Sequence, residues 1–156
     1  MKHAFMEEKD KWIVPNEGLL QAVAEEVAQG GQVLVTVRGN SMRPLWIDRR
    51  DKVVLKAFQE KDCQVGTVVL ARLGEGTYLL HRIVRIDDEW VNVMGDGNCY
   101  STEWVKKQQI VAKVTAFVRN GKTRECSGWK WKVYSWIWMR IHPLRRWLLV
   151  IWNRLN

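Results

Sequence analysis

The sequence predicts a compact, mainly antiparallel β domain with one helix before it and an amphipathic helical tail after it. Short runs of β-branched residues, separated by polar turns, dominate residues 33–118. A helical repeat of apolar residues precedes them at 16–29, and the composition changes abruptly near residue 128. A chain of 156 residues is long enough for one domain with a proper core. We therefore expect a β domain over 1–127 and a helical tail over 128–156.

The first helix is expected over residues 16–29. Asn16 is a suitable N-cap residue, and Gly30-Gly31 is a suitable C-terminal stop. Between these ends, four apolar residues recur at the spacing of a helix: Leu19, Leu20, Val23 and Val27.

Six short runs after this helix have the β-branched composition of strands: 33–37, 52–56, 67–71, 77–84, 90–94 and 110–118. Residues 74–76 and 87–89 have the composition of hairpin connections. Six closely spaced strands joined by such turns predict a mostly antiparallel sheet.

The tail carries most of the net positive charge. The formal charge of the chain is +8, yet the last 30 residues contain six basic residues and no acidic one. The six are Lys130, Lys132, Arg140, Arg145, Arg146 and Arg154. Since the rest of the chain is nearly neutral, a nucleic-acid partner is not expected.

The tail also has a regular pattern of apolar residues, which predicts one helical stripe flanked by Trp136 and Trp147. The stripe consists of Val133, Ile137, Ile141, Leu144, Leu148, Ile151 and Leu155. Pro143 lacks an N–H, so we expect a single kinked helix rather than two unrelated ones. Two roles stay open for this helix: it lies in a membrane interface, or it packs on its own domain or on a partner protein.

Cysteine usage and apolar segments indicate where the chain works. Cys63, Cys99 and Cys126 form neither a disulfide framework nor a metal-binding motif, so we expect reduced thiols and no metal or other cofactor. The first residues lack the apolar segment of a signal peptide, and no stretch reaches the roughly 18 apolar residues of a spanning helix. We expect a cytoplasmic domain, with peripheral membrane association through the tail as an open possibility.

Ser41 lies in the turn Gly39-Asn40-Ser41-Met42-Arg43-Pro44, directly after an expected strand. A catalytic serine needs a base within hydrogen-bond reach and a donor for the developing oxyanion. A turn after a strand exposes the hydroxyl and lets the backbone N–H of Ser41 point at the oxyanion. The neighbours Asn40, Met42 and Pro44 are the candidate oxyanion or substrate-binding residues.

His81 is the best available base for this serine. Alternation along its expected strand puts His81 on the face opposite Arg82, together with Leu79 and Ile83. Burial disfavours the cationic form of an imidazole, so His81 is expected to be neutral and able to accept a proton. A histidine among apolar residues is also a common core residue.

An acidic residue can complete such a site by orienting the imidazole ring and stabilising its charged form. Asp96 lies in the turn Gly95-Asp96-Gly97-Asn98, which closes the expected strand at 90–94. It is the preferred third catalytic residue, and Ser101 and Glu103 are weaker candidates. An Asx-rich turn without a catalytic role has the same composition.

Five short motifs in a fixed order resemble the serine-peptidase clan that contains signal peptidase I and the LexA-type repressor peptidases. They are G-x-S-M-x-P at 39–44, D-x-V at 51–53, G-x-V-V at 66–69, H-R-I-V at 81–84 and G-D-x-N at 95–98. The resemblance implies a mainly β fold with Ser41 as the nucleophile and His81 as the general base. Bacterial signal peptidases and LexA use a lysine as the base, whereas eukaryotic and archaeal signal peptidases use a histidine, so the chain resembles the histidine branch.

The chain departs from the pattern of this clan at several places. Gly39 stands where signal peptidases carry a serine that supports the oxyanion hole, so the second oxyanion donor stays open. Arg50-Asp51 and Gly66-Thr67 replace two Gly-Asp pairs. Residues 101–103, Ser-Thr-Glu, occupy the acidic positions of the clan.

The sequence therefore predicts a serine endopeptidase that uses a Ser/His dyad or a Ser/His/Asp triad on a peptide or a leader-bearing precursor. Two alternatives stay open. A LexA-like regulator that cleaves itself shares the G-x-S-M motif, although a DNA-reading helix-turn-helix is lacking. A catalytically inactive peptide-binding module of the same fold would account for the departures from the clan's pattern.

Overall fold

The computed structural model describes residues 16–74 and 77–155 of the chain. Its strands are β1 (Gln32–Thr36), β2 (Lys52–Ala57), β3 (Val68–Gly74), β4 (Thr77–Ile86), β5 (Trp90–Met94), β6 (Glu103–Lys106), β7 (Ile110–Arg119) and β8 (Lys122–Glu125). Its α-helices are α1 (Asn16–Ala28), α2 (Gly128–Arg140) and α3 (Arg145–Leu155). The strands form one sheet in the order β1-β2-β7-β3-β4-β5-β6, and β8 pairs with β7. Every pairing is antiparallel.

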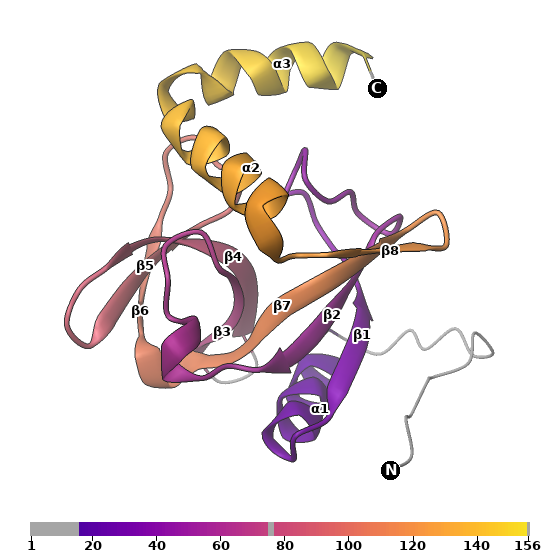
Figure 1. Cartoon of the computed structure of the whole chain (residues 1–156), viewed down its shortest axis with the longest axis vertical. Helices are drawn as coiled ribbons and strands as arrows, with labels where there is room; N and C mark the ends of the chain where they lie inside the picture. Colours follow the sequence, from indigo (N-terminus) through magenta and orange to yellow (C-terminus); the bar gives the residue numbers. More distant parts are fainter. Residues whose placement is uncertain (1–15, 75–76, 156) are drawn as a thin grey trace.

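This architecture confirms the predicted fold class (Figure 1). The six predicted strands correspond to β1, β2, β3, β4, β5 and β7, with ends that differ by at most a few residues. Strands β6 and β8 were not predicted, because each has only four residues and few β-branched side chains. The predicted turn at 87–89 joins β4 to β5 as a hairpin. Asn16 is the first residue of α1, but the proposed capping concerns its side chain, which lies outside what the structure describes, as do the loop residues 75–76.

Helix α1 ends at Ala28, one residue before the predicted end and directly before the predicted glycine stop. Gly30 has a φ of +86°, a conformation that glycine adopts without steric cost. The N–H groups of Gly30 and Gly31 then donate to the carbonyls of Val27 and Glu26 and close the last turn. Val23 and Val27 are buried against the sheet, so α1 covers the core beneath β1 and β2 (Figure 1).

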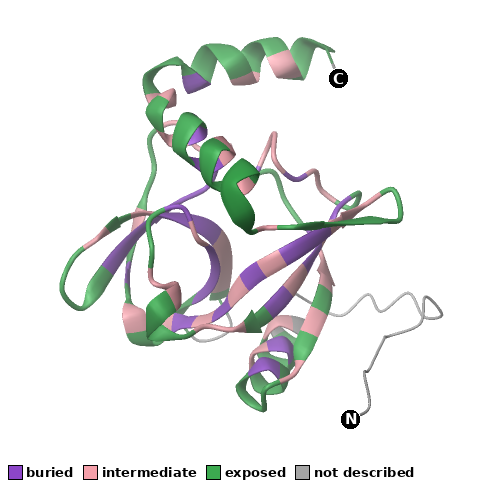
Figure 2. Ribbon diagram, viewed as in Figure 1, coloured by how far each residue is buried: buried purple, intermediate pink, exposed green. Residues whose placement is uncertain are grey.

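The core consists of two clusters that lie along the buried stretches of the strands (Figure 2). The first lies among α1, β2, β3 and β7, and the second among β3, β4, β5, β6 and β7. The loop between β1 and β2 contributes Met42 and Trp46 to the first cluster, where both are almost completely buried. Truncating a buried tryptophan typically costs about 3–5 kcal/mol. These two buried side chains therefore anchor the loop that carries Ser41.

Helix α2 packs across the sheet through one face. The Trp131 ring stacks on Trp46 with 6.5 Å between centroids, and Tyr134 stacks on Trp138 at 6.3 Å. Ser135 and Trp138 are buried. Packing of the tail on its own domain, one of the two roles left open above, therefore holds for this face of α2.

The tail is not the single kinked helix that the sequence predicts. Residues His142–Leu144 form a 3₁₀ turn between α2 and α3, and the two helices run in different directions (Figure 1). Pro143 lies in the first turn of this segment, where its missing N–H leaves no helical hydrogen bond unmade. The expected single helix is wrong because the chain tightens and turns at the proline instead of bending there.

Candidate active site

Ser41 lies in a turn whose shape is set by local hydrogen bonds. Gly39 has a φ of +82°, and its N–H donates to Asp48 Oδ1 at 2.8 Å. The N–H of Arg43 donates to the carbonyl of Asn40 at 3.1 Å, and the Arg43–Pro44 peptide bond is cis. The two hydrogen bonds define a turn in which Ser41 is half-buried.

Asp51 anchors the far end of this loop from inside the protein. Its fully buried carboxylate accepts hydrogen bonds from the N–H of Ile47 at 2.8 Å and from Arg50 and Arg119, both at 2.9 Å. Arg119 also donates to the carbonyl of Leu45. Burial acts to raise the pKa of Asp51, but the hydrogen bonds of Arg119, Arg50 and Ile47 outweigh it and lower the pKa to about 2. The residue at the D-x-V motif is thus a structural support of the Ser41 loop.

The Ser41 loop contacts the turn at 95–98 directly. The N–H of Gly97 donates to the carbonyl of Ser41 at 2.7 Å. A Cβ atom on Gly95 would overlap the Ser41 carbonyl oxygen and would lie 3.1 Å from Nε2 of His81. A Cβ atom on Gly97 would lie 2.7 Å from the carbonyl oxygen of Asn40. Both positions therefore require glycine, because the backbone of the Ser41 loop comes too close for a side chain. The backbone of Ser41 also lies near the His81 ring.

His81 lies on β4 opposite Val69 of β3, and its side chain is 6% exposed. The neighbours Leu79 and Ile83 belong to the second core cluster, as alternation along the strand predicts. Nδ1 of His81 lies 3.1 Å from Oε2 of Glu103. Nε2, the other ring nitrogen, lies beside Gly95. Burial lowers the pKa of His81, against the opposing charge and hydrogen bond of Glu103 and the charge of Asp96. The imidazole is therefore neutral at pH 7.

Glu103, and not Asp96, holds the imidazole ring. Glu103 lies opposite Val93 on β5, which lies opposite Ile83 on β4, so all three share the face of His81. Asp96, the preferred third catalytic residue, has its buried carboxylate engaged by Arg82 with two hydrogen bonds, and its catalytic role stays a prediction. Sequence reasoning ranked Glu103 low because its position depends on β6, a strand that was not predicted.

Arg82 connects the 95–98 turn to helix α2. Its Nε and Nη2 donate to the two carboxylate oxygens of Asp96 at 2.8 and 2.6 Å. Its Nη1 donates to the Gly66 carbonyl at 2.9 Å and to Ser135 Oγ at 2.7 Å. The rings of Trp131 and Tyr134 lie against its guanidinium at 5.3 and 5.8 Å. This buried ion pair fixes the turn that contacts Ser41 and makes α2 part of the support of the site.

A second buried arginine holds the same turn from α3. Nη1 of Arg145 donates to the carbonyl of Asn98 at 3.2 Å, and Nη2 donates to the carbonyl of Trp138 at 2.9 Å. The indole N–H of Trp138 donates to the carbonyl of Asp96 at 3.2 Å. The turn at 95–98 is thus held by side chains of β4, α2 and α3.

The predicted oxyanion or substrate-binding residues have different surroundings. Met42 is 2% exposed, and its side chain lies inside the core. Asn40 is exposed, and Pro44 is half-buried after the cis bond. Among the described residues, no group accepts a hydrogen bond from the backbone N–H of Ser41 or of Met42. These two N–H groups are the candidate donors to an oxyanion.

The Ser41 hydroxyl and Nε2 of His81 are not joined by a hydrogen bond. Among the described residues, neither atom has a hydrogen-bond partner. Catalytic hydrogen bonds are often long before substrate binds and tighten in the complex. Any reaction at this site therefore requires a movement that brings the Ser41 hydroxyl into hydrogen-bond contact with Nε2 of His81.

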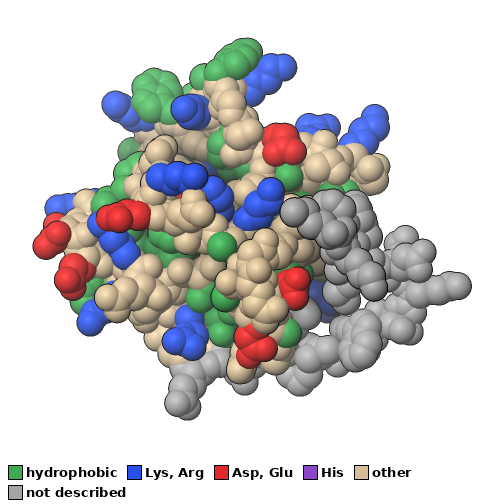
Figure 3. Space-filling model, turned by 60° about the horizontal axis from the view of Figure 1, so that its bottom comes forward, with side chains coloured by type: hydrophobic (Ala, Val, Ile, Leu, Met, Phe, Trp, Pro, Cys, Tyr) green, Lys and Arg blue, Asp and Glu red, His purple; other side chains and the backbone are tan. Residues whose placement is uncertain are grey.

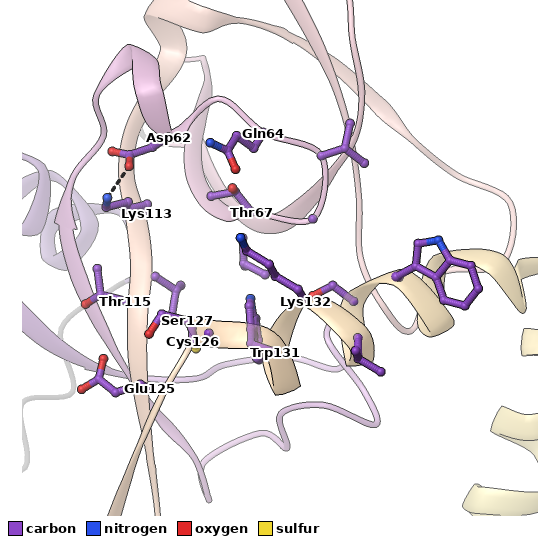
Figure 4. A pocket seen from close by; sticks show the side chains of 18 of the residues that line it. Asp62, Gln64, Thr67, Lys113, Thr115, Glu125, Cys126, Ser127, Trp131 and Lys132 are labelled. Carbon is purple, nitrogen blue, oxygen red and sulfur yellow. Dashed lines mark hydrogen bonds and ion pairs between the residues drawn. The ribbon is translucent and has the colours of Figure 1, made fainter.

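A cavity of about 990 Å³ lies elsewhere, between α2 and the strands β3 and β7 (Figure 4). Lys132 extends over it, and Asp62 and Lys113 form an ion pair at one side. Cys126 lines it, but burial raises the pKa of this thiol to about 12, so it stays protonated and unreactive. Neither Ser41 nor His81 lines this cavity.

The three cysteines are unpaired, as the sequence predicts. Within the described residues, no three His, Cys, Asp or Glu side chains are grouped closely enough to hold a metal ion. The groups that the structure brings together at the site are a serine hydroxyl, a neutral imidazole, a carboxylate and two backbone N–H groups. Comparison of the chain with protein-family models and with curated protein sequences gave no match.

Proposed function

We propose that this protein is a serine endopeptidase in which Ser41 is the nucleophile, His81 the general base and Glu103 the residue that orients the base. The observation that carries the proposal is that the two nitrogens of the His81 ring have different surroundings. Its Nδ1 is engaged by Glu103, so the opposite nitrogen is left for the serine loop that lies across Gly95. A neutral imidazole held in this way has the tautomer that a general base needs.

The reaction follows from these groups. His81 Nε2 takes the proton of the Ser41 hydroxyl as the oxygen attacks the carbonyl carbon of the scissile peptide bond. The backbone N–H groups of Ser41 and Met42 donate to the resulting oxyanion. The imidazolium then returns its proton to the leaving amine, and an acyl-enzyme forms. Water, deprotonated by the same imidazole, hydrolyses the ester and restores the serine hydroxyl.

The proposed substrate is a peptide or a protein precursor that carries a leader to be removed. The motifs that resemble signal peptidases and LexA support this class of substrate. We place the reaction in the cytoplasm as part of the proposal. A reporter fused to the β domain that is active only outside the membrane would contradict that location.

Cleavage of a quenched peptide library, followed by mass spectrometry, tests the activity. The wild-type chain is compared with Ser41→Ala, His81→Ala and the matched control Ser127→Ala, whose serine is exposed and forms no side-chain hydrogen bond among the described residues. We expect cleavage by wild type and control and a loss of about 10³-fold or more in the two site variants. Equal rates in all four proteins would overturn the proposal.

The same preparation separates the two alternative functions. Incubation of pure protein without peptide gives two fragments if the chain cleaves itself, and Ser41→Ala then stays intact. Peptide binding without cleavage by wild type identifies a binding module of the same fold. Either result would replace the proposed cleavage of separate substrates.

A further inference from the structure

The outer side of α2 and α3 presents an apolar face that is not used to hold the fold together. Trp129, Trp136 and Ile137 of α2 and Trp147, Ile151 and Leu155 of α3 are 45–78% exposed. We call these six residues the outer face. The side of each helix that carries it is exposed (Figure 2).

The helices are attached to the domain through different residues. Trp131, Ser135 and Trp138 of α2 and Arg145 of α3 form the inward contacts. The predicted aliphatic stripe of the tail lies mostly on the outer side: only Ile141 is half-buried, and its other six members are 40–78% exposed. Many large apolar side chains exposed on one side of two successive helices are uncommon on a protein that works alone in water and indicate an interaction site.

The positive charge beside the outer face favours a partner with a negatively charged surface. Helices α2 and α3 carry the exposed cations Lys130, Lys132, Arg140, Arg146 and Arg154 and no acidic residue. The Arg140 guanidinium lies 5.2 Å from the Trp136 ring. Hydrophobic and basic side chains lie next to one another at the top of the view in Figure 3, where these helices lie. A second copy docked on this face would bring two cationic surfaces together, whereas anionic headgroups neutralise them.

We propose that the outer face docks on the surface of an anionic lipid bilayer. An amphipathic helix with aromatic residues on one side and cations beside them lies in the plane of the interface, with its apolar side chains in the boundary of the acyl chains. Lysine and arginine stems extend along the apolar surface and keep their charges at the headgroups. Among the described residues, no helix is long and apolar enough to span a bilayer.

Docking brings the Ser41 loop close to the bilayer. The inward side of α3 contacts this loop, with Arg43 Cζ 5.6 Å from the Trp152 ring, and contacts the neighbouring turn through Arg145 and Asn98. One helix diameter, about 10 Å, then separates the loop from the lipid. The docking concerns α2 and α3 alone and stands whether or not Ser41 is a nucleophile.

Flotation of the full chain with vesicles tests the proposal. Vesicles of phosphatidylcholine are compared with vesicles that also contain about 30 mol% phosphatidylglycerol, an anionic lipid. We expect binding to the anionic vesicles to be about tenfold stronger or more, and to weaken when salt rises from about 0.1 to about 0.5 M, because salt screens the headgroups. Trp fluorescence shifts to shorter wavelength on binding.

Matched variants connect the binding to the outer face. The triple variant Trp147→Ser, Ile151→Ser and Leu155→Ser loses about tenfold or more in affinity, because each side chain leaves the acyl boundary. The control removes exposed apolar residues of the sheet: Leu34→Ser, Leu73→Ser and Trp90→Ser. Its affinity stays at the wild-type value, and circular dichroism confirms that both variants fold.

A charge variant gives an independent measurement if the apolar variant fails to fold. Arg140→Gln, Arg146→Gln and Arg154→Gln reduce binding to anionic vesicles about tenfold or more. The control, with the same net charge, is Arg72→Gln, Arg85→Gln and Arg124→Gln, and it binds like wild type. Equal binding by variant and control overturns the proposal. Absence of wild-type binding to either vesicle overturns it as well, as does lipid-free dimerisation that the apolar variant abolishes.

Discussion

Nδ1 of His81 lies 3.1 Å from Oε2 of Glu103, although 22 residues separate them in the chain. The contact is made across β5, between a residue of β4 and a residue of β6. It distinguishes the two ring nitrogens, since the carboxylate occupies Nδ1 and the proposed mechanism uses Nε2 to take the proton of Ser41.

Glu103→Gln tests the role of this carboxylate. The amide keeps an oxygen beside Nδ1 but removes the charge that raises the pKa of His81, so that pKa falls further below its usual value. We expect kcat/KM to fall about 100-fold or more, and the acid limb of its pH profile to move to lower pH. In wild type that limb already lies below about 6.5, because burial depresses the pKa of His81. Glu89→Gln, an exposed hairpin residue, is the control, and an unmoved acid limb would contradict the assignment.

Gly95→Ala tests the close approach of the Ser41 loop and the His81 ring. The added methyl group overlaps the Ser41 carbonyl and lies 3.1 Å from Nε2 of His81. We expect the free energy of unfolding to fall by about 1–3 kcal/mol and cleavage to fall about 100-fold or more. Gly74→Ala is the control, because no atom lies within 4 Å of its Cβ position. Urea denaturation and a peptide-cleavage rate are the measurements, and equal effects of the two alanines would count against the contact.

Arg82→Met tests the buried ion pair behind the site. The substitution leaves the Asp96 carboxylate buried without its two hydrogen bonds. We expect the free energy of unfolding to fall by about 3–5 kcal/mol. Arg85→Met, on an exposed position of the same strand, should change it by less than about 0.5 kcal/mol. Denaturant midpoints that coincide for the two variants would show that the ion pair is not needed.

Asp51→Asn tests the anchor of the Ser41 loop through its pH dependence. The pKa of Asp51 is about 2 in the folded protein and near 4 in the unfolded chain, so its carboxylate stabilises the fold above about pH 4. That contribution, about 2–3 kcal/mol, is lost as the pH falls from about 4 towards 2. The stability difference between wild type and Asp51→Asn should therefore shrink over this interval. Urea titrations at several pH values measure it, and Asp88→Asn, exposed in a hairpin, should show no such trend.

The strands of the sheet could be predicted because their signals are local. Runs of β-branched residues identified β2, β5 and β7 within about a residue at each end. The role of Glu103 could not be predicted in this way, since it depends on register across two strand pairs. The position of Asp96 in a turn likewise gave no indication that Arg82 would donate two hydrogen bonds to its carboxylate.

In the tail, the helical periodicity of apolar residues did not predict which side of the helix packs on the sheet. It identified residues that share one side of a helix, but the energy of packing decides which side meets the sheet. The large rings of Trp131 and Trp138 fill the space beside Trp46 and Asp96, so the narrower aliphatic stripe is left outside. Burial of Met42 was missed for the same reason, because a motif position says nothing about core packing.

The link between Arg82 and Ser135 spans 53 residues, and this has a consequence for protein synthesis. A ribosome delivers the strands and the serine loop before it delivers α2. A nascent chain that has emerged only as far as β8 therefore holds Arg82 without the Ser135 hydroxyl and without the Trp131 and Tyr134 rings. The contacts that hold the turn beside Ser41 are therefore complete only after α2 has been made, so this turn is fixed on Ser41 and His81 later than the sheet is formed.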